Sequence, residues 1–149
     1  MTLELYNEIK ANFEQILADF MTCKPQFVID IAPVTKKNSQ RILKNHKTGK
    51  YFIAPSENYE DYEAAAGYFL RPTDIDYAVN IAYLFYMPTR RRVDLGNLIN
   101  AADDVLVKYG VVKDDNSKII KTHNGSLVLY DKERPRTEIY ITRLDLTRF

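Results

Sequence analysis

The sequence predicts an α+β domain built on a mixed β-sheet of five or six short strands with two or three helices. Its length of 149 residues fits one domain and leaves little room for two. Hydrophobic residues make up 46% and charged residues 28%, which is typical of a chain that buries one core. Helical and strand periodicities follow each other along the chain, with hairpin signals and a single strand–helix–strand crossover, and this order favours the α+β class.

We expect neither a membrane-spanning nor a secreted protein. No apolar run approaches the roughly 18 residues that a membrane span requires, and the amino terminus alternates charged with apolar residues instead of showing a signal-peptide core. Cys23 is the only cysteine, so an internal disulfide and a thiolate metal cluster are excluded. We interpret Cys23 as a packing residue and expect a cytoplasmic location.

The first predicted element is an amphipathic helix over residues 3 to 21, which Pro25 ends. A strand is expected over 26 to 31. The apolar residues of the helix recur at alternating steps of three and four, so they form a stripe that must pack on something. The stripe consists of Tyr6, Ile9, Phe13, Ile16 and Phe20, widened by Leu17 and Met21.

A basic loop or hairpin is expected over 33 to 50, followed by a short strand over 51 to 54. Ser56 offers an N-cap to a second helix of about four turns, which ends before Pro72. Ala64, Ala65 and Ala66 support this helix and Gly67 weakens it.

The second half of the chain contains the expected central strand and a third helix. Residues 77 to 86 alternate with the period of a strand and are apolar on most of both faces, as in a strand covered on both sides. Gly110 stops the third helix. Asn124-Gly125 is a two-residue hairpin signal, unless the segments that flank it are one bent strand. The remaining expected elements are the helix from about Val93 to Tyr109 and strands over 117 to 122, 127 to 130 and 137 to 144.

Basic residues are segregated from acidic ones, although the net charge is only +1. Between Asp30 and Glu57 there is no acid, and a second basic block lies ahead of the third helix. Such segregation suggests a face that binds a polyanion, and solvated surface charge is the open alternative. The basic residues are Lys36, Lys37, Arg41, Lys44, Lys47 and Lys50 in the first block, and Arg90, Arg91 and Arg92 in the second.

Common catalytic signatures are absent from the sequence. It contains no phosphate-binding glycine loop and no histidine-based zinc motif. We interpret His46, in the basic loop, and His123, beside the Asn-Gly turn, as surface polar residues.

The third helix and the segment after it carry the candidate chemistry. At about 100° per residue, one face of the helix is polar and Asp103 points to the opposite side. Asp114-Asp115 follows where Gly110 returns the chain toward the sheet. Aspartates brought together repel one another unless a cation neutralises them, and an all-oxygen set favours Mg²⁺ or Mn²⁺. The polar stripe consists of Asp94, Asn97, Ala101, Asp104 and Lys108.

Two interpretations of these aspartates remain open. In the first, Asp114 and Asp115 form a solvated turn and Asp94 only caps its helix. In the second, they hold a hard divalent metal beside the three arginines. A metal held by carboxylates next to guanidinium groups suits a phosphodiester, because the metal polarises a phosphoryl oxygen and activates water while arginine neutralises phosphates.

Over residues 26 to 144 the sequence resembles the RusA-type Holliday junction resolvases, small endodeoxyribonucleases of bacteria and their phages. The most specific segments are 94 to 97 after the arginines, 104 to 106, and 112 to 116. Segments 33 to 38, 55 to 56 and 135 to 139 support the resemblance. The resemblance implies a RusA-like fold and a homodimer that resolves four-way DNA junctions by paired symmetric nicks, using Mg²⁺ with Mn²⁺ as a substitute.

Five residues match the family motif and two positions depart from it. The matches are Asp94, Asn97, Asp104, Asp114 and Asp115. The family's second aspartate is Gly96 here, and its lysine is Asn100, so one metal carboxylate and one cation near the transition state are missing. We expect Asp104 to complete the metal set and Lys118 or Lys121 to replace the amine.

The remaining expectations concern DNA, domains and an alternative function. Residues 25 to 149 form the expected endonuclease domain, and the helix in residues 1 to 24 packs on it or extends a dimer interface. A DNA-junction binding protein with weak or no catalysis is the alternative, because of Gly96 and Asn100. The residues expected to hold the DNA backbone are Lys36, Lys37, Asn38, Arg41, Arg90, Arg91 and Arg92.

Overall fold

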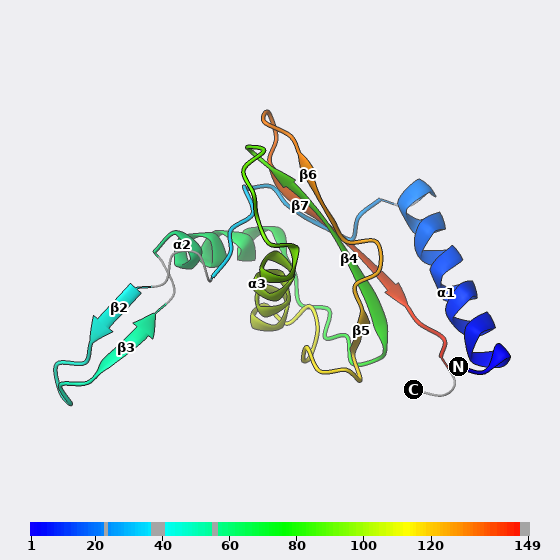
Figure 1. The fold of residues 1–149 in the computed structure, drawn as a ribbon, viewed down its shortest axis with the longest axis horizontal. Helices are drawn as coiled ribbons and strands as arrows, with labels where there is room; N and C mark the ends of the chain where they lie inside the picture. Colours follow the sequence, from blue (N-terminus) through cyan, green and yellow to red (C-terminus); the bar gives the residue numbers. More distant parts are fainter. Residues whose placement is uncertain (23, 37–40, 55–56, 147–149) are drawn as a thin grey trace.

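The structure is a computed structural model that describes residues 1–22, 24–36, 41–54 and 57–146. It contains a twisted five-stranded sheet with α3 on one side and α1 beyond the other, and a separate two-stranded hairpin (Figure 1). In chain order the elements are α1 (Leu3–Thr22), β1 (Phe27–Ile29), β2 (Arg41–Lys44), β3 (Tyr51–Ala54), α2 (Glu57–Ala66), the 3₁₀ turn η2 (Gly67–Phe69), β4 (Val79–Met87), α3 (Leu95–Lys108), β5 (Ile120–Thr122), β6 (Leu127–Tyr130) and β7 (Arg136–Arg143). The predicted α+β class and mixed sheet are confirmed.

Strand β4 is central, as predicted. It pairs antiparallel with β7 from Val79↔Arg143 to Tyr86↔Arg136, and β7 pairs antiparallel with β1. On its other edge β4 pairs in parallel with β5 near its start and with β6 near its end. The hairpin predicted at Asn124-Gly125 is therefore wrong. Both flanking segments run in the same direction along β4, as the alternative of one bent strand implies, although the structure divides them into β5 and β6.

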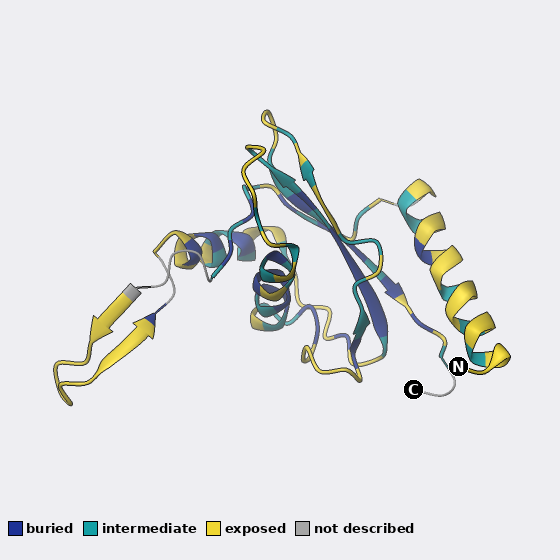
Figure 2. Cartoon of the chain, viewed as in Figure 1, coloured by how far each residue is buried: buried dark blue, intermediate teal, exposed yellow. Residues whose placement is uncertain are grey.

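The core lies between the sheet and α3 (Figure 2). Strand β4 is buried on both faces over its first half, and Val79, Ile81 and Tyr83 have no exposed surface. Helix α3 buries Leu98, Val105 and Leu106 against this layer, and its exposed polar residues lie on the side that faces away from the core.

Helix α1 contacts the second face of the sheet. Its bounds match the predicted helix, and Ile16 is its one buried residue. The Phe20 ring meets the Tyr140 ring edge-on at 4.8 Å between centroids, and it also packs over Gly125, where a Cβ would come within 2.4 Å of it. None of the helices in the described ranges has the length and hydropathy of a membrane span.

Tyr109 connects α2 to the end of α3. Its hydroxyl donates a hydrogen bond of 2.7 Å to the carbonyl oxygen of Glu63, and its ring occupies the space above Gly67. A Cβ at position 67 would lie 2.5 Å from that ring, so only glycine permits this approach. The contact holds α2 beside the polar stripe of α3.

Candidate metal and DNA site

The polar stripe of α3 faces α2 and the segment after β1. Lys108 forms an ion pair with Glu63 of α2, and Asp104 forms one with Lys36. The Lys36 ammonium also lies 5.3 Å from the ring centroid of Tyr59, a buried residue of α2. Burial, the charge of Glu63 and the charge of Asp104 raise the pKa of Tyr59, so its hydroxyl stays neutral. Lys36 is expected on a DNA-binding loop. The structure places its ammonium group beside the carboxylate of Asp104, on the polar stripe of α3.

Asp114 and Asp115 lie in the exposed loop between α3 and β5. Asp114 accepts hydrogen bonds of 2.8 Å from the Asn116 amide side chain and from the Asp115 backbone N–H. These bonds lower the pKa of Asp114. The pKa of Asp115 is raised by partial burial, by Asp114 and by the charge of Asp104. The charge of Asp104 therefore acts on Asp115, although the two residues lie on different elements.

Asp94 has the capping role that was one of its two open interpretations. It is exposed, and its Oδ1 accepts a hydrogen bond of 3.2 Å from the Asn97 backbone N–H at the start of α3. A Cβ at Gly96 would lie 3.2 Å from this same oxygen. The glycine thus leaves room for the capped conformation of Asp94.

The donor set has the chemistry of a hard-metal site but not a closed shell of ligands. Within the described ranges, no three His, Cys, Asp or Glu side chains lie close enough together to hold a metal ion. The Asp104 carboxylate is neutralised by an ammonium group, and Asp115 has a raised pKa beside like charges. A bound cation would stabilise both carboxylates, because it would neutralise the charge of Asp104 and lower the pKa of Asp115.

A family model described as "Endodeoxyribonuclease RusA" matches residues 30–142 of the chain. The chain belongs to the RusA family. A relative named "Crossover junction endodeoxyribonuclease RusA", from Aquifex aeolicus (strain VF5), is 33% identical over 105 residues, which cover 68% of this chain and 79% of that protein. The RusA match includes the β2–β3 hairpin, α2, α3 and the aspartate loop, whereas α1 lies outside it.

The two lysines expected to supply the missing amine, Lys118 and Lys121, lie in the loop before β5 and in β5 itself. Lys118 is exposed in the aspartate loop, where its backbone N–H donates to Asn116. The Lys121 ammonium donates a hydrogen bond of 3.0 Å to the Ser117 carbonyl oxygen. Lys121 also lines a cavity of about 440 Å³, together with Ile9 and Phe13 of α1. Lys36, by contrast, forms an ion pair with Asp104, one of the expected metal ligands.

The basic residues expected to hold DNA are only partly described. Arg90, Arg91 and Arg92 are exposed in the connection between β4 and α3, and the Arg90 guanidinium carbon lies 4.3 Å from the Tyr130 ring centroid. Lys37 and Asn38 lie outside the described residues, and Arg41 begins β2.

A hydrogen-bonded network behind α3 was missed by the sequence analysis, and the interpretation of His123 as a surface residue is wrong. Its Nε2 lies 2.9 Å from Asp103 Oδ2 and its Nδ1 lies 2.8 Å from the Ile81 carbonyl. The Tyr83 hydroxyl donates to the other Asp103 oxygen at 2.7 Å, and the Tyr83 ring stacks on the imidazole. The available signal was Asp103 itself, because an aspartate on the sheet-facing side of a helix needs a partner.

The network predicts a pH dependence of stability. Burial opposes the charged imidazole, but Asp103 and the Ile81 carbonyl together raise the pKa of His123 above 6.5. Because the pKa of His123 is higher in the folded than in the unfolded protein, protonation of His123 stabilises the fold. This contribution is complete below about pH 6.5 and disappears as the pH rises through the pKa of the folded state. Urea unfolding across this range should show that the stability difference between the wild type and His123→Gln shrinks as the pH rises. A constant difference would contradict the charged pair.

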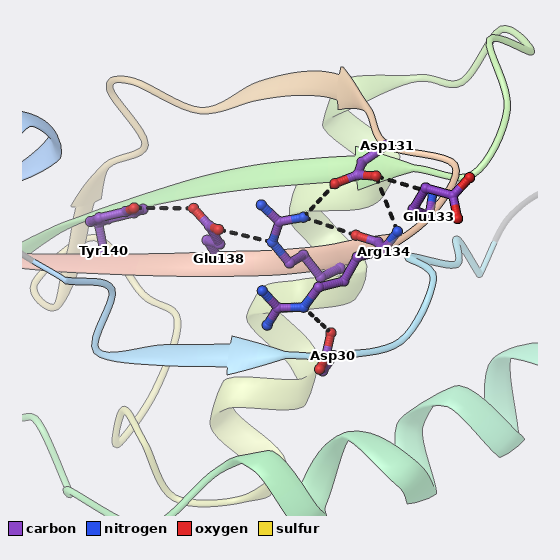
Figure 3. Close-up of polar contacts among 7 residues, drawn as sticks. Asp30, Asp131, Glu133, Arg134, Glu138 and Tyr140 are labelled. Carbon is purple, nitrogen blue, oxygen red and sulfur yellow. Dashed lines mark hydrogen bonds and ion pairs between the residues drawn. The ribbon is translucent and has the colours of Figure 1, made fainter.

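A second network fixes the start of β7 (Figure 3). Arg136 donates hydrogen bonds of 2.9 Å to Asp131 and Glu138, and its guanidinium carbon lies 3.7 Å from the Tyr86 ring centroid. Arg134 donates to Asp30 at 3.0 Å. These arginines hold the turn after β6 against the sheet.

Proposed function

We propose that this protein is a Mg²⁺-dependent homodimeric endonuclease that resolves four-way DNA junctions by paired symmetric nicks. The observation that carries the proposal is the match of residues 30–142 to the family model described as "Endodeoxyribonuclease RusA", and the effect of the Asp104 charge on Asp115 supports it. Membership of the RusA family and the name of the relative support a junction as the substrate.

Asp94, Asp104, Asp114 and Asp115 would hold the metal, with Asn97 beside them at the helix start. Carboxylate oxygens suit Mg²⁺, and Mn²⁺ accepts the same donors. When bound, the metal supplies polarisation of a phosphoryl oxygen and activation of water. Asp94 uses Oδ1 for its capping hydrogen bond, so Oδ2 would be the oxygen that it contributes.

We assign the missing amine of the RusA motif to Lys36 in preference to Lys118 or Lys121. Its ammonium already lies at the Asp104 carboxylate, and its side chain is 37% exposed, so it can reach a phosphate when a metal neutralises the aspartate. Arg90, Arg91 and Arg92 would hold the flanking DNA backbone without contacting bases. Two sites related by a dimer axis would let both strands of a symmetric junction be cut in one encounter.

The test is incubation of the purified protein with an end-labelled four-way junction, with and without Mg²⁺. The proposal predicts nicks at symmetric positions in two opposing strands that need the metal, and no comparable cutting of a linear duplex of the same sequence. Junction binding without metal-dependent nicks would instead support the catalytically weak or inactive binding protein. Gly96, Asn100 and the capping role of Asp94 are the observations that favour this second candidate.

A salt series checks the proposed phosphate contacts. A protein that neutralises about six phosphates loses roughly 1,000-fold in affinity between 50 and 200 mM salt, because bound counterions are released. We expect a fall of this order for the junction, measured by fluorescence anisotropy. Triple replacement of Arg90, Arg91 and Arg92 by alanine should reduce the slope by about three ions. An unchanged slope in that variant would remove the arginines from the DNA contact.

A further inference from the structure

The β2–β3 hairpin projects from the rest of the chain and is exposed over nearly its whole length (Figures 1 and 2). Its register pairs Ile42 with Ile53 and Lys44 with Tyr51. Because side chains alternate between faces, these four residues share one face. Phe52 and Leu43 are paired on the other face.

Large apolar side chains on this hairpin have no core of their own to enter. Ile42 is 76% exposed, Tyr51 70% and Ile53 68%, so the first face presents three large apolar groups to solvent. An isolated two-stranded hairpin is marginally stable in water, and an exposed apolar surface rimmed by polar residues marks an interaction site. The hairpin is therefore suited to being covered by a partner.

The charge of the hairpin selects the kind of partner. Lys44, Lys47 and Lys50 lie on it or in its turn, and the sequence from 31 to 56 contains no acid. The Lys44 ammonium lies 5.8 Å from the Tyr51 ring centroid, so cation and aromatic ring are side by side on the same face. A second copy of the hairpin would bring the same positive charge and be repelled. A polyanion with flat apolar groups, which is a nucleic acid, matches both properties.

We propose that the β2–β3 hairpin is a wedge that stacks Tyr51, with Ile42 and Ile53 beside it, on the bases at the branch point of a DNA junction, while its lysines contact the adjoining phosphates. This inference rests on the proposed function. The base pairs that flank a branch point are held less tightly than those inside a linear duplex, so an inserted ring can unstack them at a lower energetic cost. The wedge would thus select the shape of the DNA and not its sequence.

The experiment uses the full chain carrying Asp115→Asn, to prevent cutting, and a four-way junction with 2-aminopurine at the branch point. Unstacking of this base raises its fluorescence. The proposal predicts a severalfold rise on binding, and no rise when the label lies in an arm of the junction. Adding Tyr51→Ala and Ile53→Ala together should remove the rise and weaken junction binding about tenfold, with linear duplex binding unchanged. Tyr68→Ala, which removes a 91% exposed tyrosine outside the hairpin, is the matched control and should keep the signal.

Lys47→Ala with Lys50→Ala is a second variant that separates charge from stacking. It should weaken binding to junction and duplex alike and keep the fluorescence rise. Junction-selective binding with no rise, or a rise that survives loss of Tyr51 and Ile53, would overturn the wedge and leave the proposed function standing. A change of oligomeric state in the Tyr51/Ile53 variant, measured without DNA by light scattering, would show a protein partner instead and also overturn it. Absence of any junction preference in the protein with an intact hairpin would overturn both.

Discussion

Replacing Asp115 by asparagine is expected to abolish junction cleavage. The change keeps the shape of the side chain but removes one of the charges that share the site with Asp104 and Asp114. Metal assistance contributes several kcal/mol to the transition state, so loss of a ligand should lower the single-turnover cleavage rate by roughly 1,000-fold. Junction affinity should be equal or higher, because a negative charge near the phosphates is removed.

Asp145→Asn is the matched control for this variant. Asp145 is exposed after β7, outside the family match, and its backbone N–H donates to Asn12 of α1. The Asp145→Asn variant should cleave the junction at the wild-type rate. If Asp115→Asn retained the wild-type rate under the same conditions, the assignment of the double aspartate to the metal site would be wrong.

His123→Ala should produce the largest loss of stability among single changes of polar residues near the site. It removes both hydrogen bonds of the imidazole and leaves the Asp103 carboxylate with only the Tyr83 hydroxyl. Breaking a buried ion pair costs about 3–5 kcal/mol. The His123 and Asp103 side chains keep 23% and 13% of their surface exposed, so we expect a smaller loss of roughly 2–3 kcal/mol in the free energy of unfolding.

The sequence offers its own control, since the other histidine, His46, is exposed in the turn of the β2–β3 hairpin. Urea unfolding of His46→Ala should match the wild type within about 0.5 kcal/mol. Equal midpoints for His123→Ala and His46→Ala would show that the network behind α3 does not support the fold.

Helices and the central strand could be predicted because their signals are local. The third helix was expected from Val93 to Tyr109 and is found at Leu95–Lys108, where the Asp94 cap and Gly110 set its ends. The alternation in β4 likewise reflects burial on both faces of one strand. In these cases the residues that decide the structure lie within a few positions of one another.

The path of β5 and β6 shows where local signals fail. Asn124-Gly125 has the composition of a tight hairpin, and Gly125 does adopt a positive φ of 89°. Pairing with β4 prevails over the local preference, because the Asn80 side chain binds the Asn124 backbone through both its oxygen and its nitrogen. The bend therefore returns the chain to the same strand edge.

The missed contacts of the site join residues far apart in sequence. Lys36 and Asp104 are separated by 68 positions, and Asp103 and His123 by 20. Periodicity placed Asp104 on the polar stripe and Asp103 on the opposite side, but it carries no information about which loop meets either residue. The pairing partners follow from tertiary packing of α2, α3 and the sheet.

Binding of Mn²⁺ to the isotope-labelled protein, followed by NMR, tests the central claim most directly. The ion broadens the signals of nuclei close to it, so it reports its own position without relying on activity. We expect the backbone signals of residues 94 to 97, 103 to 105 and 114 to 116 to disappear first and saturably, while those of α1 persist. Saturable broadening centred elsewhere, or no saturable broadening at all, would contradict a metal held by the aspartates of α3 and the loop that follows it.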